Sequence, residues 1–276
     1  MQYPFEMCSF YTFVCFIFIG MATRTITERH EYILSKISKK GKLNIDDLAR
    51  EMKVSGVTIR KDLKLLEEKN LLFRTKGGAS IHNPYAGDKP INEKEFINME
   101  EKKKIAKAAL AFIRNADSIM IGSGTTAFAL ASALHPSKKT TVITPALKVG
   151  LELSGRNNIE VLQLGGVIRP NSSSVAGGYA LQVLETISCE LLFLGVDGIE
   201  LDYGATISNL TEATLNRKMI ETAQTLILLA DSSKFNRRGV AKICSAEQID
   251  YIITDDKISA RLVTQFEDRG VKIIMS

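Results

Sequence analysis

The chain has 276 residues, of which 45% are hydrophobic and 24% are charged, and its formal net charge is +5. That length accommodates a small domain and a full-sized one, and the composition excludes a disordered or fibrous chain. The four cysteines have no paired spacing and the three histidines are scattered, so we expect no disulfide framework, metal centre or cofactor. A reducing cytoplasm is the simplest setting.

The first 20 residues hold an apolar run, CSFYTFVCFIFIG, preceded by Glu6 and by no basic residue. The run lacks the basic start of a signal peptide and is too short to span a bilayer. Met21 follows directly and opens MATRTITERHEYIL, a natural beginning for a helix-turn-helix protein. We therefore expect residues 1–20 to be an extension that arises from a start codon placed too early, with a membrane anchor or interfacial segment as the rival interpretation.

The segment from Leu43 to Ala79 has the pattern of two short helices joined by a tight turn. Ile59, Leu63 and Leu66 recur at the spacing that lines one face of the second helix. A basic second helix of this kind is the element that enters the DNA major groove. Its N-cap and polar faces supply the predicted DNA contacts, with Arg60 and Lys61 as first choices: Ser55, Thr58, Arg60, Lys61 and Lys64. A solvated basic face is the structural alternative.

The run LLFRTKGGASI, after Asn70, has the pattern of a two-stranded ribbon, the wing of a winged helix. Arg74 and Lys76 are then expected beside the phosphates that flank the groove. We assign residues 22–82 to a winged helix-turn-helix DNA-binding domain.

Charge is divided unevenly along the chain. Residues 22–80 hold 14 Lys and Arg against 8 Asp and Glu, whereas residues 81–276 are balanced. A basic module joined to a neutral one indicates a polyanion partner for the first. The basic module has no aromatic stacking platform, which favours double-stranded DNA over a single strand.

The second domain begins after residues 83–92, NPYAGDKPIN, whose composition is typical of a linker. Residues 93–114 have a helical pattern, and its candidates for a buried face are Ile97, Ile105, Ala109 and Phe112. Seven short apolar runs follow, separated by helical or turn segments: SIMIG, TVIT, IEVLQLGG, LLFLGV, TLILLAD, YIITDD and VKIIMS. This alternation predicts an α/β domain with a mostly parallel sheet, covered on both faces, over residues 93–276.

Ligands of such sheets bind at the carboxyl ends of the strands. After the first strand a glycine-rich turn opens a helix, and its backbone N–H groups and hydroxyls suit a phosphate: Gly122, Ser123, Gly124, Thr125 and Thr126. Later strand ends supply further candidate ligand contacts: Asp197, Gly198, Thr206 and Lys234. The structural alternatives are an ordinary strand-to-helix turn, a capping Asp231 and a solvated Lys234.

Nucleotide cofactors are disfavoured. Gly122-x-Gly124-x-x-Ala127 fits the loose dinucleotide fingerprint, but Thr144-Pro145 stands at the end of the next strand, where an acidic residue is needed. The sequence also has no GxxxxGK[ST] loop for a nucleoside triphosphate.

A long, irregularly spaced signature runs through the first half. It comprises Arg29, Ile33 and Ile37, then Ser55-Gly56-Val57-Thr58-Ile59-Arg60-Lys61-Asp62-Leu63, and finally Arg74-x-Lys76-Gly77-Gly78-Ala79. The signature resembles that of the DeoR family of bacterial transcription regulators. It departs from the family at Lys76, where histidine is common, and at Asn70, where glycine is common; asparagine tolerates the left-handed conformation that glycine would supply.

The second half also matches the family. The matching pieces are Gly122-Ser123-Gly124-Thr125-Thr126, Gly165-Gly166, Ser174-x-x-Gly177, Gly195-Val196-Asp197-Gly198 and Asp231-Ser232-Ser233-Lys234-Phe235. They resemble the family's sugar-phosphate sensor domain, whose fold is similar to that of ribose-5-phosphate isomerase. The resemblance implies that Asp197 and Lys234 lie near positions that serve those enzymes as acid, base or phosphate ligand. Thr144-Pro145 replaces the family's frequent Thr-Asn, so the usual side-chain amide is missing there.

The sequence thus predicts a repressor of a carbohydrate-metabolism operon. Its affinity for an operator would be controlled by a phosphorylated sugar or polyol, with the phosphate on residues 122–126. We expect a homo-oligomer, because paired half-sites need paired reading helices, and the family resemblance implies a dimer or a tetramer. The alternative is a sugar-phosphate isomerase with a DNA-binding appendage, in which Asp231 or Glu200 would join Asp197 and Lys234 as the second carboxylate.

Overall fold

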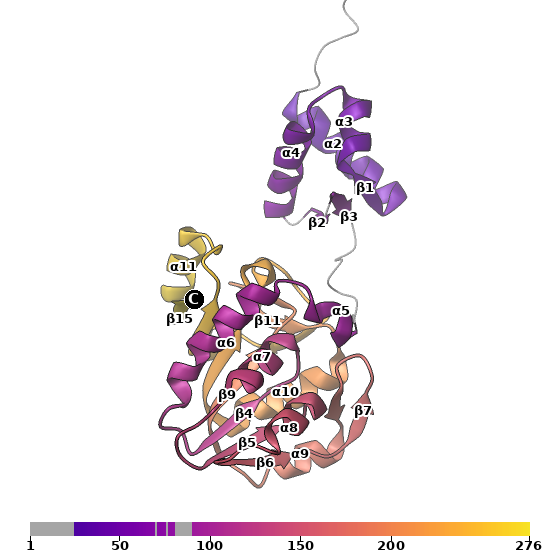
Figure 1. The fold of residues 1–276 in the computed structure, drawn as a ribbon. Helices are drawn as coiled ribbons and strands as arrows, with labels where there is room; N and C mark the ends of the chain where they lie inside the picture. Colours follow the sequence, from indigo (N-terminus) through magenta and orange to yellow (C-terminus); the bar gives the residue numbers. More distant parts are fainter. Residues whose placement is uncertain (1–24, 70, 76, 81–89) are drawn as a thin grey trace, which may run out of the picture. The chain divides into compact units, whose positions relative to one another are not determined.

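The structure is a computed structural model, and it describes four stretches of the chain: residues 25–69, 71–75, 77–80 and 90–276 (Figure 1). The chain divides into two compact units between residues 84 and 85. The proposed extension, Asn70, Lys76 and most of the predicted linker lie outside the described residues. Within those four stretches, no helix has both the length and the apolar character to cross a bilayer.

The first unit is a winged helix. Its elements in chain order are α2 (Ile26–Lys40), β1 (Lys42–Asn44), α3 (Ile45–Met52), α4 (Gly56–Glu68), β2 (Phe73–Thr75) and β3 (Gly78–Ser80). The strands form an antiparallel sheet in the order β1-β3-β2. Ser55 caps α4 as predicted, since its Oγ accepts a hydrogen bond of 3.1 Å from the Thr58 amide. Gly78 lets β3 approach β1, because a Cβ there would lie 1.9 Å from the Leu43 carbonyl oxygen.

An ion pair fixes α2 against α4. The Arg29 guanidinium donates two hydrogen bonds, of 2.7 and 2.9 Å, to the carboxylate of Asp62, which is only 2% exposed. Around this pair the helices bury an apolar cluster that includes Ile33, Ile59 and Leu63. Two residues of the family signature, Arg29 and Asp62, therefore hold the helices together and do not face outward.

The second unit is built on a seven-stranded sheet. Its strands are β4 (Ser118–Ile121), β5 (Thr140–Thr144), β6 (Ile159–Gln163), β9 (Cys189–Gly195), β12 (Ala223–Leu229), β14 (Tyr251–Thr254) and β15 (Lys272–Met275). All neighbours are parallel, in the order β15-β14-β12-β9-β4-β5-β6. Each of the seven apolar runs forms one strand, so the prediction of a mostly parallel sheet is confirmed.

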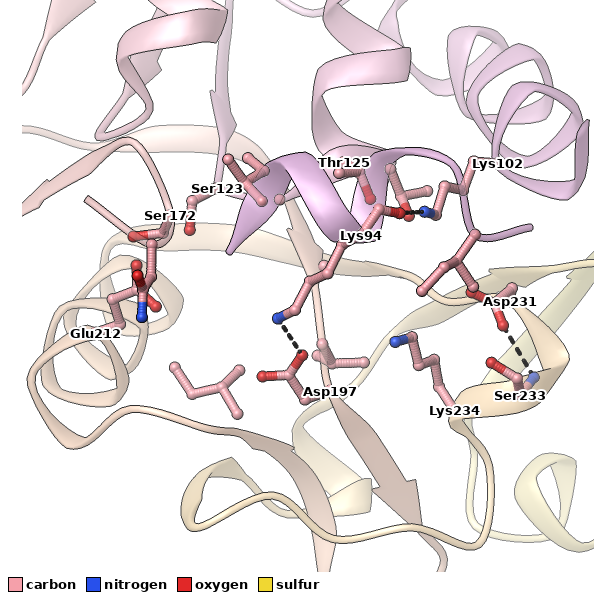
Figure 2. A pocket seen from close by; sticks show the side chains of 18 of the residues that line it. Lys94, Lys102, Ser123, Thr125, Ser172, Asp197, Glu212, Asp231, Ser233 and Lys234 are labelled. Carbon is pink, nitrogen blue, oxygen red and sulfur yellow. Dashed lines mark hydrogen bonds and ion pairs between the residues drawn. The ribbon is translucent and has the colours of Figure 1, made fainter. Parts of the chain in front are cut away.

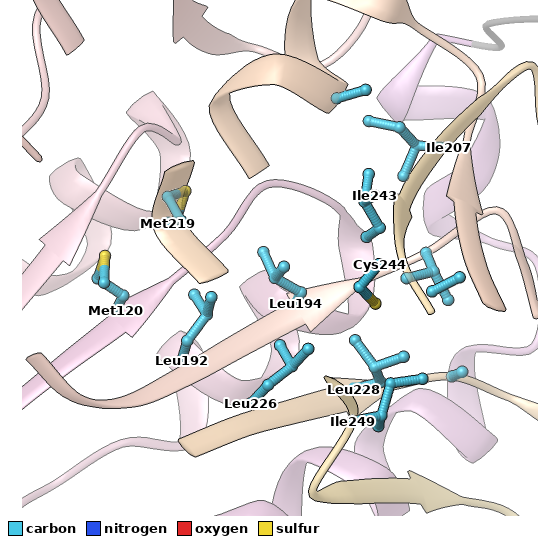
Figure 3. Close-up of a cluster of buried hydrophobic side chains, with 14 of the residues drawn as sticks. Met120, Leu192, Leu194, Ile207, Met219, Leu226, Leu228, Ile243, Cys244 and Ile249 are labelled. Atoms are coloured by element: carbon cyan, nitrogen blue, oxygen red, sulfur yellow. The ribbon is translucent and has the colours of Figure 1, made fainter. Parts of the chain in front are cut away.

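Both faces of this sheet are covered. Successive side chains of a strand point to opposite faces, and Phe193 accordingly packs in one apolar cluster while Leu192 and Leu194 pack in the other. One face is covered by α6 (Met99–Ile113), α7 (Thr125–Ala133) and α8 (Leu147–Leu153). The other is covered by α9 (Gly178–Leu184), α10 (Leu210–Thr222) and α11 (Ala260–Glu267). Figure 3 shows part of that second cluster.

Short antiparallel strands, which were not predicted, pack on the second face of the seven-stranded sheet. A hairpin pairs β7 (Val167–Arg169) with β8 (Ser174–Ala176). A three-stranded sheet joins β10 (Gly198–Glu200), β11 (Gly204–Ile207) and β13 (Ala241–Cys244). Two turns of 3-10 helix, η2 (Ser232–Lys234) and η3 (Ala246–Gln248), follow strand ends.

The prediction of a single helix over residues 93–114 is wrong in one respect. The structure has two helices there, α5 (Ile91–Glu95) and α6, separated by a turn. Asn98 breaks the helix: its φ is +52°, and its side-chain amide donates a 3.0 Å hydrogen bond to Asp231. Ile97, predicted to be buried, is about half exposed, whereas Ile91 is buried although it belongs to the predicted linker.

Candidate ligand pocket and nucleic-acid interface

The basic face of α4 is exposed. Ile59, Leu63 and Leu66 pack inward, and the side chains of Arg60, Lys61 and Lys64 consequently face solvent. Thr58 is half-buried, and its Oγ1 lies 2.9 Å from the Ser55 Oγ, so both hydroxyls belong to the cap.

The wing is tied to α4. Arg74 on β2 donates from its amide and its Nε to the two carboxylate oxygens of Glu67, at 2.9 and 2.7 Å. Its charge is thus shared with a carboxylate of α4. Lys76, the other predicted wing contact, lies outside the described residues.

A pocket opens at the carboxyl ends of β4 and β9. These two strands are neighbours in the sheet, and the chain runs from β4 outward to β5 and β6, and from β9 outward to β12, β14 and β15. Connections that leave neighbouring strands in opposite directions create a crevice at this point. The pocket is lined there by Ser123–Thr126, which follow β4, and by Gly195–Asp197, which complete β9 and follow it.

The turn after β4 presents unused donors to this pocket. Gly124 has φ +115°, and a Cβ there would meet no heavy atom within 4 Å. Gly124 is the N-cap of α7 and no side chain caps the helix, so its first N–H groups have no side-chain acceptor. In the described part of the chain, the hydroxyls of Ser123, Thr125 and Thr126 also make no hydrogen bond.

Three lysines from three different elements converge on the pocket, as Figure 2 shows. Lys94 on α5 places its Nζ 3.0 Å from an Asp197 oxygen, and Lys102 on α6 donates at 2.6 Å to the Lys94 carbonyl. The Nζ of Lys234, on η2, has no carboxylate within 4.0 Å among the described residues. It is a cation without a direct counter-ion.

Burial shifts the pKa values of the charged groups in the pocket. It lowers the pKa of Lys102 to about 8, and it lowers the pKa of Lys234 even though Asp231 and Asp197 oppose the shift. For Asp197, burial would raise the pKa, but the ammonium of Lys94 and the hydrogen bonds from Ser208 outweigh it, so the pKa is lowered and the carboxylate stays charged. An anion bound among these lysines would compensate their poor solvation.

The carboxylates named for an isomerase are already engaged. Asp231 accepts hydrogen bonds of 3.0 Å from the Ser233 amide and from Asn98, so the capping alternative holds for it. Asp197 accepts from Lys94 and Ser208. Glu200 pairs with Arg238 and does not line the pocket. None of the three is placed as an unpaired base.

Three residues predicted to contact the ligand do not line this pocket. At Gly122 a Cβ would meet a Leu194 methyl at 2.5 Å, and at Gly198 it would meet the Arg237 carbonyl oxygen at 2.3 Å, so both glycines serve close packing. The Thr206 hydroxyl is buried, donates to the Gly198 carbonyl and accepts from the Gly239 amide.

Other pocket residues were missed by sequence reasoning. They include Ile91, Lys94, Lys102, Asn171, Ser172, Glu212 and Asn216. Lys94 and Lys102 stand in a charged helical stretch that looks like an ordinary solvated face, and no local pattern separates them from their neighbours. The described residues contain no group of three or more His, Cys, Asp or Glu side chains that could hold a metal ion.

A winged helix followed by an α/β unit with an anion-suited pocket is the construction of a ligand-responsive DNA-binding regulator. The family comparisons agree. Residues 29–84 match the DeoR-like helix-turn-helix domain, and residues 97–256 match the DeoR C-terminal sensor domain. The chain belongs to the DeoR family of transcriptional regulators.

Full-length relatives are similar to this chain. The HTH-type transcriptional regulator GolR of Listeria innocua is 33% identical over 89% of this chain and 97% of its own length. The lactose phosphotransferase system repressor of Lactococcus lactis is 34% identical over 86% and 94%. The glycerol-3-phosphate regulon repressor of Escherichia coli K12 is 28% identical over 90% and 98%. All three are named as regulators or repressors.

Solved structures give weaker likenesses. The sorbitol operon regulator SorC from Klebsiella pneumoniae is 11% identical, with a TM-score of 0.41 over 85% of this chain and 98% of that one. Ribose 5-phosphate isomerase A from Neisseria gonorrhoeae is 20% identical, with a TM-score of 0.36 over 49% and 52%.

Proposed function

We propose that this protein is a repressor of a carbohydrate-metabolism operon whose affinity for its operator is set by a phosphorylated sugar or polyol. The observation that carries the proposal is Lys234, whose ammonium has no carboxylate within 4.0 Å among the described residues, in a pocket that also holds the uncapped start of α7. A helix start with free N–H groups and an ammonium without a direct ion pair together suit an anion. The names of two relatives refer to a lactose phosphotransferase system and to a glycerol-3-phosphate regulon, which supports the same effector class.

The phosphate would lie against Ser123–Thr126, with Lys234 and Lys102 as charge partners. Their ammonium groups come from η2 and α6, so a single ligand group would bridge two elements. Lys94 has a different part, because its ammonium is held by Asp197. A polyol hydroxyl that hydrogen-bonds Asp197 would compete with that ion pair.

Arg60 and Lys61 would contact base edges in the major groove, with Lys64, Arg74 and Lys76 on phosphates. These basic side chains suit the negatively charged backbone of double-stranded DNA. Two copies of the chain would be needed to read two half-sites, so the working form would be a homo-oligomer in the cytoplasm, where the operator is.

A thermal-unfolding screen of sugar phosphates, each beside its unphosphorylated sugar, tests the effector proposal. A ligand at a hundred times its dissociation constant stabilises the folded state by roughly 2.7 kcal/mol. We expect stabilisation by a phosphorylated compound only, and a loss of that effect in Lys234→Met. Lys257→Met is the matched control, because Lys257 pairs with Glu101 and does not line the pocket. Equal stabilisation by sugar and sugar phosphate would contradict the proposal.

A further inference from the structure

Asn216 is a polar side chain of the pocket that makes no hydrogen bond with the described residues. Asn216 lies on α10, lines the pocket, and is only 6% exposed. Within the described stretches its side-chain amide makes no hydrogen bond. Its amide atoms are open to the pocket, and an amide that the protein leaves without a partner there is satisfied by water or by a ligand.

The surroundings of Asn216 are fixed and poor in free cations. Glu212 is four residues earlier, on the same face of α10. Its carboxylate lies 2.7 Å from Arg169 Nη1 and accepts a 2.8 Å hydrogen bond from Ser174. The Ser174 hydroxyl also lies 2.9 Å from that of Ser172. This wall is therefore held in place before any ligand arrives.

The two sides of the pocket differ in character. Figure 2 shows Glu212 and Ser172 on one side and Lys102 and Lys234 on the other, with the Lys94–Asp197 pair between them. A phosphate is attracted to the lysines and gains no free cation beside Glu212. A bound sugar phosphate would thus be oriented, with its carbon chain directed toward α10.

We propose that Asn216 is the residue that selects among effectors, by hydrogen-bonding a hydroxyl on the carbon chain of the ligand. The inference rests on the proposed function. An amide offers both a donor and an acceptor, as a hydroxyl does, so the two groups satisfy each other without a change of charge. A site built for a hydroxyl rejects ligands that lack it, because the buried amide is then left unpaired.

Calorimetric titration with four named probes tests this: inorganic phosphate, glycerol 3-phosphate, ribose 5-phosphate and fructose 6-phosphate. In the wild type, at least one sugar or polyol phosphate should bind more tightly than inorganic phosphate. Asn216→Leu should reduce that preference by roughly tenfold, the worth of about one hydrogen bond. Its affinity for inorganic phosphate should stay the same, because the lysine side is untouched. Asn216→Ser keeps a small donor and acceptor, so its preference should lie between that of the wild type and that of Asn216→Leu.

Thermal unfolding without ligand separates recognition from structure. Replacing an unpaired buried amide by a side chain of similar size and no polarity should leave the midpoint unchanged or raise it. Early unfolding of Asn216→Leu and Asn216→Ser, with loss of inorganic phosphate binding, would show a structural role and overturn the inference. An unchanged preference in Asn216→Leu, or a wild type that prefers no probe over inorganic phosphate, would also overturn it while leaving the phosphate site intact. If the wild type binds no probe at all, the proposed effector class fails and the inference fails with it.

Discussion

The proposed DNA-contacting helix α4 and the proposed ligand pocket hold their cations in opposite ways. On α4, Arg60, Lys61 and Lys64 are exposed and solvated. In the pocket, Lys102 and Lys234 are poorly solvated and their pKa values are lowered. Solvated cations bind a polyanion by releasing counter-ions, so their binding responds to salt. Poorly solvated cations bind an anion that restores their solvation, so their binding responds to pH and to the ligand's shape.

The largest expected effect lies in the pocket. Gly124→Asp places a carboxylate where the phosphate would bind, and it should abolish the response to effector while leaving operator binding intact. The two compact units divide near residue 84, so the winged helix should fold regardless. A gel-shift titration with effector measures the response.

Gly177→Asp is the matched control for that variant. Gly177 also has φ +115° and open space around a Cβ, and it caps α9 outside this pocket. Both variants carry the same backbone strain and the same added charge. If Gly177→Asp also abolished the response, or Gly124→Asp kept it, the turn after β4 would not be the phosphate site.

The next effect concerns the first unit alone. Arg29→Met removes the guanidinium partner of the buried Asp62, and breaking such a pair costs about 3–5 kcal/mol. Operator binding should be lost as the winged helix unfolds, while effector binding by the second unit persists. Thermal unfolding in the presence of operator and in the presence of effector measures which unit has lost stability. Arg50→Met, which removes an exposed pair with Asp47, should change stability little; equal losses would argue against Arg29 as the anchor.

A smaller effect is expected on the reading face. Arg60→Ala should reduce specific operator affinity by about 1–3 kcal/mol and relax the preference at one base pair, if Arg60 contacts a guanine edge. Lys64→Ala should weaken specific and random DNA alike and reduce the salt slope by roughly one. Fluorescence anisotropy over a series of salt concentrations measures both. An identical loss of affinity for operator and random DNA in Arg60→Ala would assign Arg60 to the phosphates.

The smallest effect is a pH dependence. The pKa of Lys102 is about 8 in the folded protein and ordinary in the unfolded chain, so unfolding takes up a proton between those values. Lys102 should therefore make the free energy of unfolding without ligand rise as pH rises from about 8 to 9; above that range the thiols of Cys189 and Cys244, whose pKa values burial raises to about 11, act in the opposite direction. Effector affinity should fall over the same range, by at most about tenfold per pH unit, because the ammonium is lost.

Lys102→Met should make both pH slopes shallower, as followed by thermal unfolding and calorimetry. Slopes as steep in Lys102→Met as in the wild type would assign the titration to another group, such as Lys234, whose pKa burial also lowers.

The fold was largely predictable because its signals are local. The seven strands were evident as apolar runs, since a strand buried on both faces needs apolar side chains at successive positions. The cap at Ser55 and the amphipathic α4 are likewise set within a few residues. The break at Asn98 was missed because it depends on Asp231, which is 133 residues away.

The site was predictable only in part, for the same reason. Ser123–Thr126, Asp197 and Lys234 follow strand ends, and the parallel sheet brings those ends together. Lys94, Lys102 and Asn216 come from helices that cover the sheet, and only the packing of α5, α6 and α10 turns them toward the pocket. The backbone bonds of the Thr206 hydroxyl could not be predicted, because a strand-end hydroxyl gives no sign of whether the backbone will engage it.

The central claim is that effector binding by the second unit changes operator binding by the first. Thermodynamic linkage between these two binding events tests it most directly. If effector changes operator affinity by a given factor, operator must change effector affinity by the same factor. Effector binding should therefore be measured by calorimetry on the free protein and on the operator complex. The account predicts two different dissociation constants, whose ratio equals the change of operator affinity with effector. Equal dissociation constants in the two titrations would contradict it.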